Sequence, residues 1–136
     1  PVAIREAVYL VNYLTTKKKQ TLNYDKIASG IFTQPEVGHI GLGENDLQKR
    51  SINYKILQTE FKPLKYAFSN KNNPVFIKVL YQPKTEKIFG IIYIGESAAE
   101  IIQSLAISFA KTFTLNDLRN TVPVHPTSSE ELVTLV

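Results

Sequence analysis

The sequence contains no cysteine, no methionine and no tryptophan in its 136 residues, and it contains only two histidines. Without cysteine, these residues exclude a disulfide framework, a thiol nucleophile, a dithiol redox pair and a cysteine zinc site. Two histidines alone make a poor metal site, so we predict no metal. No run approaches the roughly 20 uninterrupted apolar residues of a membrane helix, and Arg5 and Glu6 interrupt the first apolar run, which is not the layout of a signal peptide. We therefore expect a soluble, cytoplasmic protein with no membrane partner.

The composition that is present is ordinary for one globular domain. Hydrophobic residues make up 43% of the sequence and charged residues 21%, and a chain of this length buries roughly two-thirds of its unfolded surface without needing a metal or a disulfide. Sixteen basic residues against 12 acidic ones give a net charge of +4, which favours anionic partners in general. The basic residues are scattered and the tyrosines do not group as stacking platforms, so we expect no nucleic-acid partner.

Apolar residues at helical spacing predict a helix over residues 1–14, with Pro1 in its first turn. The residue that would cap this helix precedes Pro1, which indicates a piece of a longer chain. A polar connector follows over residues 15–20, and its run of three lysines is typical of a solvated linker.

From residue 26 onward, short apolar runs are separated by proline and glycine, which is the pattern of an antiparallel sheet. The runs at 27–32 and 37–42 predict two strands, and Tyr54, Ile56 and Gln58 alternate as in a half-buried strand. Residues 75–81 and 87–94 predict the clearest hairpin, joined by residues 82–86.

Three helices are predicted beside these strands, and the first is a short one over residues 44–51. Ser97 and Glu100 form the S-x-x-E pattern of a capping box, and Thr114 and Asp117 open a later, shorter helix in the same way. The helix that begins after Ser97 carries an apolar stripe of Ile101, Ile102, Leu105, Phe109 and Phe113. The predicted fold class is therefore α+β, a mainly antiparallel sheet with helices packed on it.

The last segment, residues 122–132, holds the residues that best suit chemistry. Thr127 or Ser128 can cap a terminal helix, and Glu130 or Glu131 can complete the capping box, which is a purely structural interpretation. A catalytic interpretation pairs His125 with a carboxylate, because a carboxylate on one ring nitrogen leaves the other to exchange protons near neutral pH. The spacing permits this pair, since a bend at His125–Pro126 folds the ring back towards Glu130, and X-Pro bonds sometimes make such bends in the cis form.

The stretch His125–Leu135, HPTSSEELVTL, resembles the C-terminal signature of the flavoprotein pyridine nucleotide-disulfide oxidoreductases, and of the glutathione reductases among them. Residues 32–42, FTQPEVGHIGL, are similar to the family's F-x-x-P-x-(I/V)-G-x-x-G-L run, and residues 61–64 and 1–4 also resemble family segments. The resemblance covers nearly the whole chain. It implies that residues 1–22 end a FAD-binding domain, that residues 23–136 form the interface (dimerisation) domain, and that the FAD and NADPH domains lie upstream.

The resemblance also implies the catalytic roles. His125 would be the acid/base that protonates the leaving thiol of glutathione, and Glu130 would orient it. Both would act in trans on the redox disulfide of the partner subunit, so the homodimer would be the catalytic unit. The parent would be an NADPH-dependent glutathione-disulfide reductase containing FAD, and the 136 residues alone would be inactive.

Further site residues follow from the same resemblance. Phe61, Leu64 and Tyr66 would form the apolar wall that holds glutathione disulfide, and Glu131 would contact a glutathione amino group. The first helical turn, residues 1–3 (Pro1, Val2 and Ala3), would aim the positive end of the helix dipole at the flavin, with His125 and Pro126 also beside the cofactor. His39 lies outside the motifs that carry chemistry and receives no role.

Two departures from the family pattern keep alternatives open. Val8 stands where many glutathione reductases carry an arginine that grips a glutathione carboxylate, although Arg5 lies one turn earlier on a similar face. Trypanothione reductases also lack that arginine and share the HPTSxEEL ending, whereas Lys62 and Lys65 favour an anionic substrate. A dihydrolipoamide dehydrogenase fits less well, because that branch follows HPT with a single glutamate. A free-standing, non-catalytic dimerisation module is the alternative from another class.

Overall fold

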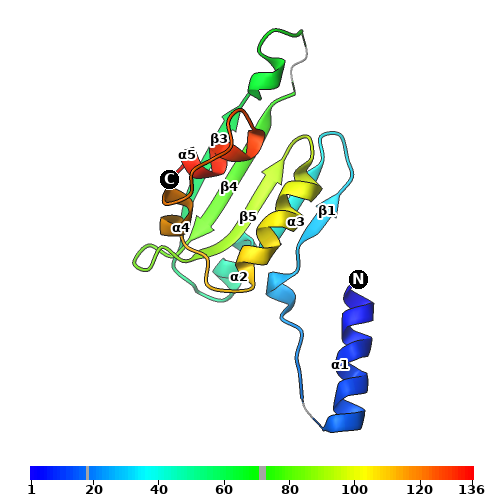
Figure 1. The fold of residues 1–136 in the computed structure, drawn as a ribbon. Helices are drawn as coiled ribbons and strands as arrows, with labels where there is room; N and C mark the ends of the chain where they lie inside the picture. Colours follow the sequence, from blue (N-terminus) through cyan, green and yellow to red (C-terminus); the bar gives the residue numbers. More distant parts are fainter. Residues whose placement is uncertain (18, 71–72) are drawn as a thin grey trace.

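A computed structural model describes residues 1–136 except residues 18 and 71–72 (Figure 1). A five-stranded sheet forms its centre, and helices precede, interrupt and follow the strands. In chain order the elements are α1 (Val2–Thr16), the 3-10 helix η1 (Tyr24–Lys26), β1 (Ser29–Ile31), β2 (Val37–Gly41), α2 (Glu44–Lys49), β3 (Lys55–Phe61), the 3-10 helix η2 (Leu64–Tyr66), β4 (Val75–Tyr81), β5 (Ile88–Ile94), α3 (Ala98–Phe109), α4 (Leu115–Arg119), the 3-10 helix η3 (Ser128–Glu130) and α5 (Glu131–Thr134). The predicted α+β class is confirmed.

The sheet has the strand order β1-β2-β5-β4-β3, and every neighbouring pair is antiparallel. The predicted hairpin is its centre: β4 pairs with β5, and the Gln82 side chain holds the turn by accepting from the Lys84 and Thr85 backbone N–H groups at 2.8 and 2.6 Å. The apolar run predicted as a strand over 27–32 is shorter in the structure, because only Ser29–Ile31 pair with β2.

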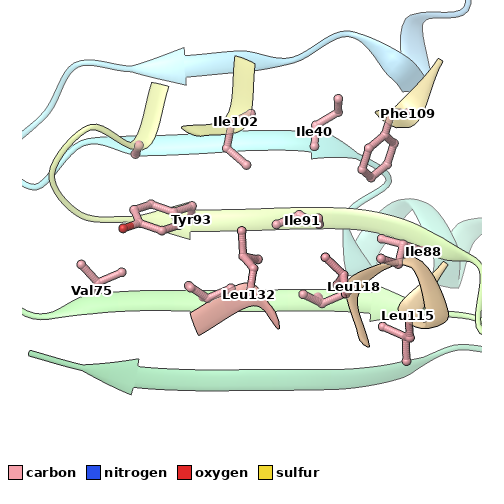
Figure 2. Close-up of a cluster of buried hydrophobic side chains, with 13 residues drawn as sticks. Ile40, Val75, Ile88, Ile91, Tyr93, Ile102, Phe109, Leu115, Leu118 and Leu132 are labelled. Atoms are coloured by element: carbon pink, nitrogen blue, oxygen red, sulfur yellow. The ribbon is translucent and has the colours of Figure 1, made fainter. Parts of the chain in front are cut away.

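Helices α3, α4 and α5 cover one face of the sheet, and the hydrophobic core lies beneath them (Figures 1 and 2). Tyr93 lies fully buried on β5 between Ile102 of α3 and Leu132 of α5 (Figure 2). Helix α3 approaches β2 so closely that a Cβ on Gly38 would lie 2.5 Å from the Ala98 carbonyl oxygen. The core consists of Ile40, Val75, Ile77, Val79, Ile88, Ile91, Tyr93, Ala98, Ile102, Phe109, Leu115, Leu118 and Leu132.

Three local predictions differ from the structure. Ser97 precedes α3 but has left-handed backbone angles (φ 62°) and no capping side-chain bond, so the predicted box with Glu100 is wrong. Strand β3 half-buries Leu57, Thr59 and Phe61, whereas the predicted residues 56 and 58 are exposed. The third predicted residue, Tyr54, is half-buried but precedes the strand. The predicted apolar stripe of α3 ends at Phe109, and its last member, residue 113, follows the helix and packs edge-on against that ring.

The capping box of α4 is confirmed, since Thr114 Oγ1 accepts from the Asp117 backbone N–H at 3.2 Å and Asp117 Oδ2 accepts from the Thr114 N–H at 2.8 Å. Helix α1 stands apart from the sheet (Figure 1) and buries none of its residues. Its visible ties to the following segment are a hydrogen bond from the Tyr24 hydroxyl to Glu6 and one from Asn12 to Gln20 at 3.4 Å. None of the helices in the described part of the chain is long and apolar enough to cross a membrane.

Candidate active site

The C-terminal segment, residues 122–136, is anchored in the core by Leu132 and exposes His125. Leu132 of α5 is only 3% exposed and anchors the segment in the core. Ahead of it, the His125–Pro126 peptide bond is cis, one of the forms that the predicted bend allows, and the Thr127 hydroxyl donates to the Val124 carbonyl at 2.8 Å. The turn that carries His125 is therefore held by its own hydrogen bond and by the buried helix that follows it.

His125 and Glu130 form the pair that the catalytic interpretation requires. His125 Nδ1 lies 2.8 Å from Glu130 Oε2. The Glu130 side chain is 14% exposed, whereas the imidazole is 69% exposed. A carboxylate accepts but does not donate, so Nδ1–H is the donor and Nε2 is left on the exposed side of the contact. The arrangement is an oriented imidazole with one nitrogen available for proton exchange.

The capping interpretation of the same segment is wrong. Thr127 precedes η3 without capping it through its side chain, and its hydroxyl is used in the turn instead. Glu130 directs its carboxylate to His125 rather than back to the helix start. The next glutamate, Glu131, is half-buried and accepts from the Thr134 hydroxyl at 3.1 Å. Thr134 is a polar neighbour of the candidate site that the sequence reasoning missed.

The three predicted wall residues have different environments. Phe61 ends β3 and packs against the core. Leu64 begins η2 and is 54% exposed. It lines a cavity of about 290 Å³ whose other wall is Pro126–Ser129, so the structure brings Leu64 beside the turn that follows His125. Tyr66 lies on a neighbouring cavity of about 740 Å³, and its hydroxyl donates to Glu96, a contact that the sequence reasoning did not find.

The predicted cofactor residues are not brought together within this chain. Pro1, Val2 and Ala3 form the exposed first turn of α1, which lies apart from α5 (Figure 1). No acidic side chain or capping side chain occupies that first turn, so its backbone N–H groups suit a partner with negative charge. Val8 is 45% exposed farther along the same helix.

His39, the other histidine, lies in β2 opposite Ile92 and is half-buried. Burial lowers the pKa of His39 below its usual range, and the nearby Asp46 carboxylate opposes that effect. No group of three or more histidine, aspartate or glutamate side chains that could hold a metal ion occurs among the described residues.

Comparisons with known proteins identify the family of the chain. The chain matches the family described as pyridine nucleotide-disulphide oxidoreductase, dimerisation domain, over residues 27–136. It is similar to glutathione reductase of Yarrowia lipolytica, with 34% identity over 140 residues, and to the chloroplastic/mitochondrial glutathione reductase of Pisum sativum, with 33% identity over 135 residues. These alignments cover 99% of this chain but 30% and 24% of those proteins, so the chain spans about a quarter to a third of the length of these relatives.

Among solved structures, the chain is similar to LpdA from Mycobacterium tuberculosis, with a TM-score of 0.73. The superposition covers 93% of this chain and 28% of that chain. Sequence identity is 18%, so this likeness concerns the fold.

Proposed function

Because the chain belongs to the dimerisation-domain family of the pyridine nucleotide-disulphide oxidoreductases, we propose that it is the interface domain of an NADPH-dependent glutathione-disulfide reductase. In this proposal residues 1–22 end the FAD-binding domain and residues 23–136 form the homodimer interface. The observation that carries the proposal is the 2.8 Å contact between His125 Nδ1 and Glu130 Oε2, with the ring exposed on its other side. The relatives named glutathione reductase support glutathione disulfide as the substrate.

The residues of this chain would handle the proton of the reaction. The sequence has no cysteine, so the attacking thiolate comes from outside these residues, and we assign it to the redox cysteine pair of the partner subunit. That thiolate forms a bond to one sulfur of glutathione disulfide while the sulfur–sulfur bond breaks. The protonated imidazole of His125 then donates its Nε2 proton to the departing sulfur, which leaves as glutathione thiol.

Glu130 would keep the imidazole in one orientation through this step. Its carboxylate is largely shielded from solvent, so it accepts from Nδ1–H and holds the ring with Nε2 on the exposed side. Leu64 would contact the substrate on the exposed wall, with Tyr66 beside it and Phe61 supporting the wall from the core side.

The remaining assignments concern the substrate amino group and the cofactors. Glu131 would accept from a glutathione amino group. The first turn of α1, Pro1, Val2 and Ala3, would face the flavin, where its N–H groups stabilise negative charge, and His125 and Pro126 would lie on its other side. FAD, when bound by the complete protein, supplies the electrons for disulfide reduction. NADPH would bind to the part of the protein that precedes these residues, and the cytoplasmic location stays a prediction.

The experiment is NADPH oxidation by the complete protein with glutathione disulfide, trypanothione disulfide and lipoamide as rival acceptors. We expect glutathione disulfide to be preferred and His125→Gln to lose about a hundredfold or more in kcat. Glu130→Gln should lose less, because the imidazole remains. The matched control is His39→Gln, which replaces the other histidine and should retain activity. Full activity in His125→Gln would refute the acid/base role.

A further inference from the structure

The turn that links β5 to α3 holds Glu96 in a fixed place. Gly95 has φ +153°, and a Cβ on it would lie 2.7 Å from Val75 Cγ2, so a side chain would not fit. Its backbone N–H donates to the Glu36 carbonyl at 2.9 Å, and Ser97 on the other side has φ 62°, in the left-handed region. These two flanking residues and the hydrogen bond to the β1–β2 connection therefore restrict the backbone conformation at Glu96.

Glu96 joins this turn to η2, thirty residues earlier in the chain. Its Oε2 atom lies 2.9 Å from Lys65 Nζ and also accepts from the Tyr66 hydroxyl. Lys65 Nζ lies 5.1 Å from the centroid of the Tyr66 ring, so the two side chains contact each other as well as the carboxylate. The hydrogen bond to Glu96 raises the pKa of Lys65 and the pKa of Tyr66, as expected for donors bound to an anion.

These polar contacts matter because apolar packing anchors η2 only at its start, where the preceding residue Pro63 is buried. None of its three residues is buried, and Phe68, which follows it, is fully exposed. Yet Leu64 of η2 lines the cavity that separates it from Pro126–Ser129, and Glu96 lines the same cavity. Glu96 therefore connects η2 to the β5–α3 turn at the same cavity that faces the turn after His125.

We propose that Glu96 is a positioning residue, which sets the affinity for the disulfide substrate by holding η2 against the turn that carries His125. This inference rests on the proposed function, and it adds a residue that touches neither the reacting sulfur atoms nor the imidazole. If the contacts of Glu96 with Lys65 and Tyr66 are removed, η2 samples other positions. The apparent affinity for the disulfide substrate then falls in proportion to the fraction of molecules in which η2 keeps its binding-competent position. For two partly exposed contacts on one carboxylate, we expect about a three- to tenfold rise in KM.

The experiment compares Glu96→Ala and Glu96→Gln in the complete protein, with glutathione disulfide as the varied substrate. The amide of Glu96→Gln still accepts from Tyr66 but gives Lys65 no charged partner, so its KM should lie between those of the native protein and Glu96→Ala. The kcat should stay within about twofold, because the acid/base pair is intact. The matched control is Glu86→Gln, which removes a comparably exposed ion pair with Arg119 (2.7 Å) in the β4–β5 turn, at the other end of the strands.

A second measurement, amide hydrogen exchange of the same proteins, reports the position of η2 independently of turnover. The Ala67 N–H donates to the Leu64 carbonyl at 2.9 Å and the Ser69 N–H to the Tyr66 carbonyl at 3.1 Å. Both amides should exchange faster in Glu96→Ala than in the native protein, and at the native rate in Glu86→Gln. Faster exchange with a KM unchanged to within twofold would overturn the proposal, and so would an equal rise of KM in Glu86→Gln.

The two proposals fail in different ways. If His125→Gln abolishes glutathione disulfide reduction but Glu96→Ala leaves KM and exchange as they are, the proposed function stands and the role of Glu96 is refuted. If the complete protein reduces no disulfide, the proposed function fails and the substrate role of Glu96 is overturned with it, whatever the exchange rates show.

Discussion

Replacing Tyr93 with phenylalanine should stabilise the protein. The Tyr93 side chain is completely buried beneath α3 and α5, and its hydroxyl forms no hydrogen bond of normal geometry with the described residues, although the Ser128 side chain lies near enough to lower its pKa. A buried polar group without a partner costs roughly 1–3 kcal/mol, and phenylalanine keeps the ring while removing that group. We expect the free energy of unfolding to rise by about 1 kcal/mol at pH 7, with a rise of about 4 °C in Tm.

The pH dependence gives the same substitution a second readout. Burial raises the pKa of Tyr93 to about 12 from its ordinary 10.0, with Ser128 acting in the opposite direction. Between these values the unfolded chain releases the Tyr93 proton while the folded chain keeps it, so the native protein loses up to about 1.4 kcal/mol of stability per pH unit as pH rises. Tyr93→Phe lacks this loss, so its advantage over the native protein should grow between pH 10 and pH 12.

Urea denaturation of both proteins at pH 7 and across the alkaline range tests this reasoning, since the other tyrosines and lysines titrate equally in the two proteins. A phenylalanine variant that is less stable than the native protein at pH 7 would refute it. That result would mean that the hydroxyl has a hydrogen-bond partner, with Ser128 the group that acts on it.

Three further substitutions test the fold and its electrostatics. Gly38→Ala should destabilise the protein by about 1–3 kcal/mol in chemical denaturation, because the new Cβ meets the Ala98 backbone at 2.5 Å; an unchanged midpoint would contradict the close approach of α3. Thr114→Ala should cost about 1 kcal/mol by removing the cap of α4, and a variant with native stability would show that the cap contributes nothing. Because burial lowers the pKa of His39, protonation favours the unfolded chain, so native stability should fall as pH drops below about 6.5, and His39→Gln should flatten that fall; identical pH profiles would rule this out.

The local pattern of the sequence was enough to predict the central hairpin and the cap of α4, because strand alternation and capping are properties of neighbouring residues. The same logic fails at Ser97, where S-x-x-E spacing is present but the backbone is left-handed, whereas an N-cap with a side-chain bond needs extended angles. It also fails on β3, because alternation shows that one face is buried without showing which one, and Ile56 lies on the exposed face.

The candidate site likewise contains one contact that local spacing predicts and one that it does not. The pairing of His125 with Glu130 spans five residues, so a single bend sufficed to predict it. The pairing of Lys65 with Glu96 joins residues that meet only after β4 and β5 have formed the hairpin between them. No local pattern marks such a contact, and the sequence therefore indicated Lys65 as a source of positive charge without indicating its partner.

The most direct test of the central claim is subunit complementation, because the claim is that His125 serves the active site of the partner subunit. Subunits carrying His125→Gln would be mixed with subunits that lack a redox cysteine in the domain proposed to precede these residues, and NADPH oxidation with glutathione disulfide would be measured. Random reassociation makes half of the dimers mixed, and each mixed dimer holds one complete site if His125 acts in trans, so about a quarter of the native activity should return. If His125 acts within its own subunit, no mixed dimer has a complete site, and the mixture would stay as inactive as its parents.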